Sequence, residues 1–316
     1  MNEGSRWIRL PLINMTMQTS DLAKLALFMY IARLLSKKQH VIKDFKKGFL
    51  PIIIPVGIIC ALIAPANLST ALLLGASCLV IIFIGRARTR HVLMVVGIAL
   101  IPLIILVSAA VLQHENKAET TEVAEKKAAT GLFIRVSTWV NRVENFIYSS
   151  NEVSHDDMYQ VNQAKMAIAK GGWFGVGPGN STIRDYLPQA YNDFIFAIII
   201  EEYGLIGGTF IVFIYLVFLY RCIRIFRKCP FAFGAFLALG LSFTLAIQAI
   251  ANMAVTVNLF PVTGVTLPLV SMGGSSFIFT CLSIGIILSV SRNVEIQEGK
   301  VAAAALAEVE EEEEEK

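Results

Sequence analysis

The stretch from Phe49 to Gly85 contains no charged residue, and it restricts the possible fold more than any other part of the chain. A helix that spans a membrane needs about 20 apolar residues, so the stretch is too long for a single span. Residues 65–67, with the sequence PAN, form the natural break, because Pro interrupts a regular helix. The sequence therefore predicts two successive membrane-spanning helices joined by a short turn.

The composition of the whole chain agrees with a membrane protein. Of its 316 residues, 55% are hydrophobic and 16% are charged, whereas soluble domains average about 25% charged residues. The cysteines and histidines lack zinc-ligand spacing, and no disulfide framework is expected. The apolar segments predict an all-α fold, a polytopic transmembrane helical bundle that forms one domain over residues 1–316. About seven spans are expected, at residues 22–35, in the two halves of 49–85, and at residues 92–113, 194–220, 230–251 and 269–290.

Basic residues gather in three short loops, at residues 36–48, 86–91 and 221–228. These loops fall on one side of the membrane if the spans are assigned in this way, and the positive-inside rule makes that side cytoplasmic. The polar segment 114–192 is then one large extracytoplasmic loop. We expect residues 114–130 within it to be mobile, because they lack the aromatic residues that an ordered core needs.

The two ends of the chain complete this topology. The tail, residues 293–316, is expected to be cytoplasmic, and its acidic run to be disordered. Residue 1 is then outside the membrane, although residues 1–20 do not form a signal peptide. We therefore expect the natural chain to carry an odd number of further spans upstream.

Asp193 immediately precedes the apolar segment that begins at Phe194. Asp is a preferred helix N-cap, and position alone slightly favours that role. A carboxylate at the membrane edge can also have a raised pKa and act as a general base. Asp185 lies in the preceding loop and is expected to fold back towards Asp193, where the pair can share a proton or hold a divalent cation such as Mg or Mn. An ordinary solvated loop position is the alternative for Asp185.

Glu201 and Glu202 lie inside the following span, about 12 Å deeper than Asp193 at about 1.5 Å per residue. A regular helix turns both away from Asp193, so they do not form a close pair with it. We expect both to be structural, as partners in hydrogen bonds between helices. The alternative is a proton or cation site inside the bundle.

The sequence GGWFGVGPGN at residues 171–180 resembles a phosphate-binding loop only loosely. It lacks the GK[ST] ending, so a nucleotide site is not expected. Its glycines can still let backbone N–H groups approach an anionic ligand. Cations nearby either bind lipid phosphates without specificity or form a pyrophosphate clamp; these are Arg135, Arg142, Lys165, Lys170 and Arg184.

Residues 252–276 contain Pro261, Gly264, Pro268, Gly273 and Gly274, which prevent a regular helix between the last two spans. Irregular backbone at membrane depth is tolerated where it is buried in protein or lines a cavity. This segment therefore indicates a functional site more than simple packing of helices.

Four motifs spread over nearly the whole chain point to one family. They are GSRWI (residues 4–8) with Gln18, Ser20 and Asp21; the segment from Gln163 to Gly179; YLPQAYNDFIFAIIIEEYGLIG (residues 186–207); and GVTLPLVSMGGSS (residues 264–276). Together they resemble the SEDS family (shape, elongation, division and sporulation), to which FtsW, RodA and SpoVE belong. The chain departs from the family pattern at Thr19, Asn67, Gln189, Asn192 and Met272, where the family has Pro, Asp, Glu, Thr and Tyr.

The resemblance implies a ten-span fold, with three spans before Met1. It also implies an inverting peptidoglycan glycosyltransferase that polymerises lipid II, an undecaprenyl-pyrophosphate-linked disaccharide pentapeptide, at the outer face of the cytoplasmic membrane. By this analogy Asp193 deprotonates the acceptor hydroxyl, and arginines or a divalent cation stabilise the leaving pyrophosphate. Asp185 is the second candidate catalytic residue. Substrate contacts are expected from Arg6, Trp7, Gln18, Arg135, Arg142, Gln163, Lys165, Ser271, Gly273, Gly274 and Ser275.

Within the family, GSRWI and GVGPGNS are closer to the FtsW type than to the RodA type. The resemblance thus implies septal wall synthesis in cell division, with a class B penicillin-binding protein transpeptidase, divisome proteins and membrane lipid as partners, and no nucleic acid. Three alternatives stay open: a RodA-type elongation polymerase, a lipid II flippase and a catalytically silent scaffold. The spans are mostly free of polar residues, which favours a polymerase over a flippase.

Overall fold

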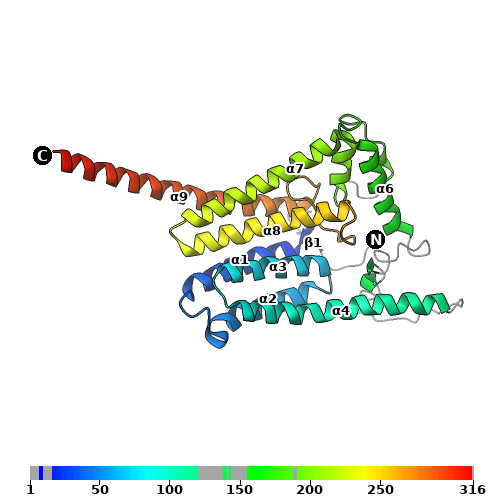
Figure 1. Cartoon of the computed structure of the whole chain (residues 1–316), viewed down its shortest axis with the longest axis horizontal. Helices are drawn as coiled ribbons and strands as arrows, with labels where there is room; N and C mark the ends of the chain where they lie inside the picture. The colour runs from blue at the N-terminus through cyan, green and yellow to red at the C-terminus, as the bar shows by residue number, and fades with distance from the viewer. Residues whose placement is uncertain are drawn as a thin grey trace.

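The computed structural model describes residues 7–9, 16–119, 138–140, 142–143, 155–187 and 191–314. Within these residues, long helices pack side by side in an antiparallel bundle, and a short helix crosses one of its ends (Figure 1). The bundle helices are α1 (Thr19–Lys37), α2 (Leu50–Ile63), α3 (Leu68–Ile84), α4 (Thr89–Glu119), α7 (Ile195–Lys228), α8 (Ala232–Thr256) and α9 (Gly274–Glu314). The crossing helix is α6 (His155–Gly171).

The predicted multi-pass helical bundle is confirmed. Five helical segments of the described chain are long and apolar enough to cross a membrane, and Leu68–Ile84 is a shorter apolar helix. The break between α2 and α3 falls at residues 64–67, as the PAN sequence predicts. Helix α1 contains charged residues, and two of them, Asp21 and Lys24, form an ion pair of 2.8 Å one turn apart.

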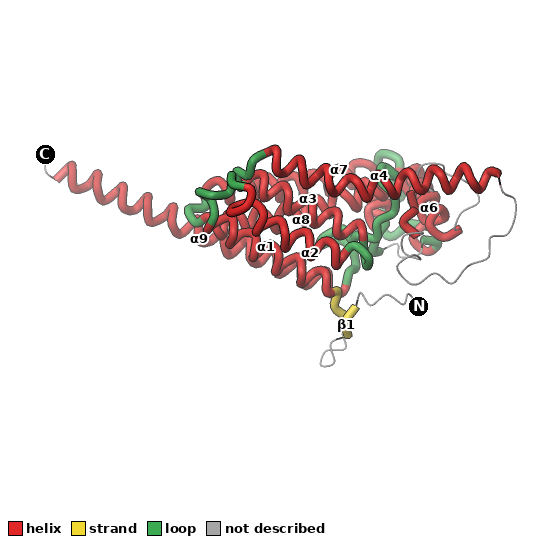
Figure 2. The backbone as a smooth tube through the Cα atoms, turned by 90° about the horizontal axis from the view of Figure 1, so that it is seen from below, coloured by secondary structure: helices red, strands yellow, loops and turns green. Residues whose placement is uncertain are grey.

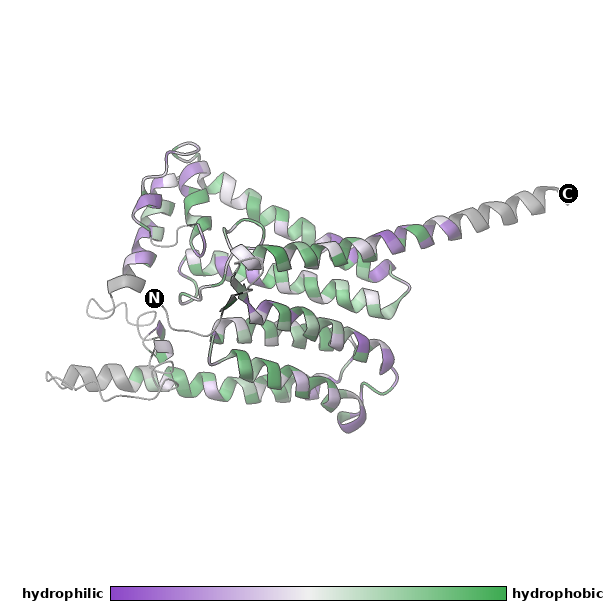
Figure 3. Ribbon diagram, turned by 180° about the vertical axis from the view of Figure 1, so that it is seen from behind, coloured by the Kyte–Doolittle hydropathy of each residue, from purple (hydrophilic) through white to green (hydrophobic). Residues whose placement is uncertain are grey.

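Helix α8 is the centre of the bundle and packs against α1, α3, α7 and α9. Its Gly240 allows this close packing, because a Cβ atom there would lie 2.9 Å from the ring of Phe28 on α1 and 3.0 Å from Ile81 on α3. Helix α4 lies at the edge, and none of its membrane-spanning window is buried inside the protein. Figure 3 shows its apolar residues along the outside of the bundle.

The three basic loops lie at the same end of the bundle, as the assigned spans require (Figure 1). The first of them leads into α2 through a π-helix, η1 (Phe45–Phe49). The opposite end carries α6, the 3₁₀-helix η2 (Ile183–Asp185) and the two-stranded sheet of β1 (Trp7–Arg9) and β2 (Thr16–Gln18). The strands are antiparallel, with Trp7 paired to Gln18. Figure 2 shows this small sheet projecting beside the helix ends.

Two expected disordered segments differ from the structure. Helix α4 continues to Glu119, which includes the first residues of the segment expected to be mobile, whereas residues 120–130 lie outside the described chain. The tail was expected to be disordered, but α9 continues through it to Glu314. Ala and Glu dominate this part of the sequence and both have high helix propensity, which explains the extension.

Helix α7 is interrupted near its N-terminal end, at Gly204, which has φ 73° and ψ −175°. The loop 172–177 fills this interruption through four backbone hydrogen bonds. The N–H groups of Val176 and Gly177 donate to the carbonyls of Glu201 and Glu202, and those of Leu205 and Ile206 donate to Gly172 and Trp173. The loop and the helix are therefore one hydrogen-bonded unit.

Glycine makes this close approach possible. A Cβ atom on Gly175 would lie 2.2 Å from the Glu202 carbonyl oxygen, and one on Gly204 would lie 2.2 Å from the Trp173 carbonyl oxygen. Gly175 also has φ +78°, a conformation that L-residues with side chains rarely adopt. Side chains at these positions would separate the loop from α7.

We predict that Gly175→Ala destabilises the protein, by about 1–3 kcal/mol from the strained backbone alone, with the steric clash added. The matched control is Gly97→Ala in α4, where a Cβ atom meets nothing within 4 Å. Thermal unfolding of the detergent-solubilised variants measures both. A midpoint for Gly175→Ala equal to that of the control would contradict the inferred loop–helix contact.

Candidate functional site

Asp193 lies in the turn between η2 and α7, two residues before the helix begins at Ile195. The N-cap position belongs to Phe194, and no side chain caps the helix. The slightly favoured capping role of Asp193 is therefore wrong. The helix starts where it does because Phe194 is 1% exposed and packs into a cluster with Ala164 of α6 and Ile198.

The turn that carries Asp193 is held by hydrogen bonds that three of its successive backbone carbonyls accept. The N–H group of Met272 donates to the Tyr191 carbonyl at 2.9 Å. The Ser271 hydroxyl donates to the Asn192 carbonyl at 2.5 Å, and the Asn252 amide donates to the Asp193 carbonyl at 2.9 Å. We call these three hydrogen bonds the carbonyl clamp.

The clamp joins the Asp193 turn to α8 and to the irregular segment 257–273. The Asn252 amide also donates to the Val265 carbonyl at 2.7 Å, so one side chain holds both segments. The Ser271 hydroxyl also accepts from the N–H group of Leu267 at 2.7 Å. Because the clamp uses only main-chain carbonyls of the turn, it leaves the carboxylate of Asp193 available for another role.

The surroundings of the Asp193 carboxylate change its acidity. Burial raises its pKa above the usual range of an aspartate, and the nearby positive charge of Arg142 opposes this shift. Arg142 donates to the Val262 carbonyl at 3.4 Å, which attaches it to the same irregular segment. Gly264 lies beside the carboxylate, since a Cβ atom there would be 3.7 Å from Asp193 Oδ2. A raised pKa strengthens a carboxylate as a proton acceptor at neutral pH.

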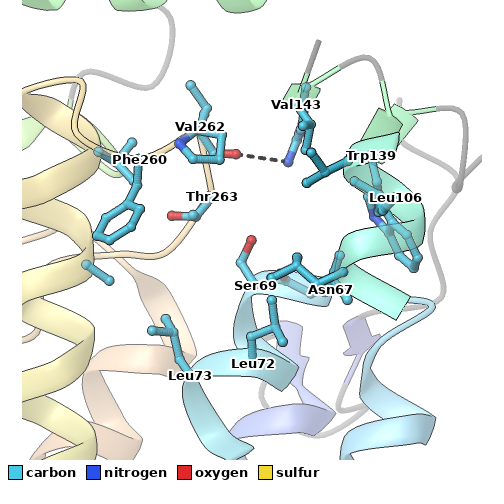
Figure 4. Close-up of a pocket in the computed structure, with 18 residues that line it drawn as sticks. Asn67, Ser69, Leu72, Leu73, Leu106, Trp139, Val143, Phe260, Val262 and Thr263 are labelled. Carbon is cyan, nitrogen blue, oxygen red and sulfur yellow. Dashed lines mark hydrogen bonds between the residues drawn. The ribbon is translucent and has the colours of Figure 1, made fainter. Parts of the chain in front are cut away.

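A cavity of about 570 Å³ adjoins this carboxylate, because Arg142 and Gly264 both belong to its lining. Figure 4 shows leucines of α3 and α4 and Phe260 around it, with polar atoms from Asn67, Ser69 and Thr263. Asn67, where the family pattern has Asp, caps α3 by accepting from the N–H group of Thr70 at 3.2 Å. The site thus combines an apolar cavity with a half-buried carboxylate and an arginine.

Asp185 has different surroundings from Asp193. Its side chain is 73% exposed, and its carboxylate lies 3.4 Å from Arg184 Nε. Within the described residues, no group of three or more His, Cys, Asp or Glu side chains is arranged to hold a metal ion. The shared proton and the divalent cation between Asp185 and Asp193 therefore stay predictions.

Glu201 has the structural role expected of it. It is fully buried and accepts hydrogen bonds from the Ser181 hydroxyl and, at 3.2 Å, from the Thr182 N–H group. Lys170 Nζ lies 3.4 Å from its carboxylate, so this predicted anion-binding cation forms an internal ion pair. Glu202 contributes its backbone carbonyl, which accepts from Gly177.

Two N–H groups of the Gly-rich loop are used within the protein, whereas an anion-binding role for the loop stays a prediction. Its Val176 and Gly177 N–H groups donate to α7 rather than to open space, as described above. The sequence could not distinguish the two uses, because a close approach to a ligand and a close approach to a helix both require glycine.

The other predicted substrate-binding residues have varied positions. Ser271 and Ser275 are buried, and the Ser275 hydroxyl accepts from the Gln18 N–H group at 3.3 Å. Gln163 is half-buried and Lys165 is exposed on α6. Gly273 and Gly274 lie where the irregular segment enters α9, and Trp7 lies in β1. Arg6 and Arg135 lie outside the described residues.

Sequence reasoning missed Asn252. Its side chain is 1% exposed, within a helix long and apolar enough to cross a membrane. A signal was present, because polar residues inside such helices are costly and often mark functional sites.

The fold and site define a multi-pass membrane protein with a half-buried carboxylate beside an apolar cavity at one end of its bundle. The chain belongs to the FtsW/RodA/SpoVE family, described as "Cell cycle protein", whose sequence model matches residues 1–296. It is 34% identical over 295 residues to stage V sporulation protein E of Bacillus subtilis, covering 92% of this chain and 73% of that protein. It is also 34% identical to a probable peptidoglycan glycosyltransferase FtsW of Geobacter sp. strain M18, covering 91% and 71%.

Solved structures share the fold. One, described as "Structural coordination of polymerization and crosslinking by a peptidoglycan synthase complex", has a TM-score of 0.64 at 24% identity and covers 93% of this chain and 74% of that one. The rod shape determining protein RodA of Thermus thermophilus has a TM-score of 0.57 at 22% identity, with 93% and 71% covered. At these identities the likeness concerns the fold.

We predict that Asn252→Ala loosens the Asp193 turn. The variant leaves the Asp193 carbonyl and the buried Val265 carbonyl without their shared donor, which costs on the order of 1–3 kcal/mol for an unsatisfied buried group. Hydrogen–deuterium exchange should become faster in peptides from residues 191–200. Asn162→Ala, at an exposed position of α6, is the control and should leave this exchange unchanged. Equal exchange in wild type and Asn252→Ala would contradict the clamp.

Proposed function

We propose that this protein is a peptidoglycan glycosyltransferase that polymerises lipid II, with Asp193 as its general base. The main evidence is the geometry around Asp193. Its main-chain carbonyl is held by the carbonyl clamp, and its carboxylate lies beside Arg142 and the cavity. The name of several relatives, probable peptidoglycan glycosyltransferase FtsW, supports the same reaction. Family membership supports it over nearly the whole chain.

The proposed reaction is one displacement at a sugar carbon. Asp193 accepts the proton of the acceptor hydroxyl, and the resulting oxygen nucleophile attacks the anomeric carbon of the donor. A new C–O glycosidic bond forms, the C–O bond to the lipid pyrophosphate breaks, and that electron pair leaves with the pyrophosphate. Attack from the face opposite the leaving group inverts the anomeric carbon. Arg142 is placed to stabilise the negative charge that develops there.

The cavity suits the lipid part of such a substrate. Its lining is mostly apolar, with Leu72, Leu106 and Phe260 among the contributors, and it adjoins the carboxylate at one end of the bundle. A polyprenyl chain in this cavity would present its pyrophosphate and sugar to Arg142 and Asp193. The polar atoms of Asn67, Ser69 and Thr263 are placed to contact the head of the substrate.

The same proposal includes a location. The basic loops lie at the end of the bundle opposite Asp193, and by the positive-inside rule this arrangement supports a position of Asp193 at the extracytoplasmic face of the cytoplasmic membrane. Donor and acceptor strands lie on that side in the proposed reaction.

The alternative of a flippase is less well supported, because a flippase would need polar groups along the membrane depth. The buried carboxylate of Glu201 is instead bonded to Lys170, Ser181 and Thr182.

The proposed partners follow from family membership. A class B penicillin-binding protein transpeptidase would cross-link the strands, and the fold shared with a peptidoglycan synthase complex supports such an assembly. Septal synthesis with divisome proteins is the preferred role because FtsW names recur among the relatives, and RodA-type elongation is the alternative.

A divalent cation, Mg or Mn, remains a proposal. The described side chains do not form a complete ion site, so further ligands would have to come from the substrate pyrophosphate. The proton transfer to Asp193 does not depend on such an ion.

We predict that Asp193→Asn slows glycan polymerisation by roughly 10²–10⁴-fold, the usual contribution of a general base. The substitution keeps the main-chain carbonyl that the clamp uses and removes the proton-accepting charge. Glu201→Gln keeps hydrogen-bonding capacity and should be the milder change. Asp185→Asn is the matched variant, because it also removes one carboxylate from the same end of the protein. If it lowers the polymerisation rate as much as Asp193→Asn does, the result would support a carboxylate pair.

The measurement uses labelled lipid II and the full-length protein with its transpeptidase, at matched protein levels. Wild-type activity of Asp193→Asn would reject the general base. An inactive Glu201→Gln beside an active Asp193→Asn would move the site into the membrane and favour a transporter.

A further inference from the structure

Two large aromatic side chains are exposed at the outer end of α7. Trp173 is 71% exposed and Phe174 is 83% exposed. They lie on the loop 172–177, which is bonded to α7 by the four backbone hydrogen bonds described above. The position of both residues is therefore tied to the helix.

The length of α7 indicates the depth of these residues. The segment from Tyr203 to Tyr220 has no charged residue, and the basic cluster begins at Arg221. Its continuous helical part, which begins after Gly204, is about 24 Å long at about 1.5 Å per residue, which is comparable to the hydrocarbon thickness of about 30 Å. The Trp173 carbonyl accepts from the Ile206 N–H group near the outer end of this segment. The backbone of Trp173 is thus bonded to α7 close to the end of its uncharged segment that lies opposite the basic cluster.

The two aromatics also adjoin an exposed apolar face of α7. One face of α7 has exposed apolar side chains at helical spacing, from 40% to 66% exposed: Ile206, Phe210, Phe213, Val217 and Tyr220. Ile206 belongs to this face and is also bonded to Trp173. Trp is enriched at membrane interfaces, because its ring is apolar and its N–H group remains hydrogen-bonded.

We propose that Trp173 and Phe174 form an interfacial anchor that inserts into the headgroup region of the outer leaflet. The occupant of this surface is the lipid itself. Through the loop–helix unit the anchor fixes the depth of the outer end of α7, and with it the height of Asp193 above the hydrocarbon core. The proposal is independent of the reaction that the site performs.

The test compares wild type with Trp173→Phe in nanodiscs, without any partner protein. The phosphatidylcholine carries bromine at shallow or at deep acyl carbons, and the difference in emission between the two proteins reports Trp173. Shallow bromines should remove more of this emission than deep ones, and aqueous acrylamide should remove little. Trp173 emission that acrylamide quenches and bromines leave unchanged would overturn the anchor and leave the surface to a protein partner.

A control and a second probe complete the experiment. Tyr159→Trp in the Trp173→Phe protein places a tryptophan on α6, outside the spans, where acrylamide should quench and bromines should not. Phe174→Trp in the otherwise wild-type chain should increase the emission lost to shallow bromines. This variant also serves if Trp173→Phe does not fold, and an increase only in acrylamide quenching would contradict the proposal.

Discussion

The arrangement of the site depends on hydrogen bonds to three successive carbonyls, those of Tyr191, Asn192 and Asp193. A loop at the end of a helical bundle would otherwise be free to move, and a general base must be held within hydrogen-bonding reach of its proton. The donors come from α8 and from the irregular segment before α9, so the clamp requires both to be in place. Pro and Gly in that segment permit the turns that bring Ser271 and Met272 to the Asp193 turn.

A second constraint acts on the other side of Asp193. The loop 172–177 and the interrupted α7 form one unit, and the buried Glu201 binds Ser181 and Thr182 just beyond this loop. The buried carboxylate of Glu201 in the N-terminal part of α7 thus binds and orders the segment that follows this loop. The clamp holds residues 191–193 and the loop–helix unit holds residues 201–206, so the short helical segment of α7 that follows Asp193 is hydrogen-bonded to other parts of the protein at both of its ends.

Much of the bundle could be predicted from the sequence because long uncharged segments have few alternatives in a membrane. The turn at residues 64–67, the basic ends and the position of Asp193 before α7 all followed from local composition. The role of Asn252 could not follow, since its partner Asp193 is 59 positions away in the chain. The sequence also could not show that Asp193 does not cap α7, because the start of this helix depends on the burial of Phe194 against residues of α6. The tail was misjudged because its negative charge was weighed above its helix propensity.

The proposed general base is Asp193, whose pKa is raised by burial and lowered by the nearby charge of Arg142. The most direct measurement is the pH dependence of kcat/KM for glycan polymerisation. Activity should be present above the pKa of Asp193 and lost as pH falls through it, at a pH above the usual aspartate range. Arg142→Gln removes the opposing charge and should move this acidic limb to higher pH, whereas Arg184→Gln, beside the exposed Asp185, should leave it in place. An acidic limb that Arg142→Gln does not move would contradict the account.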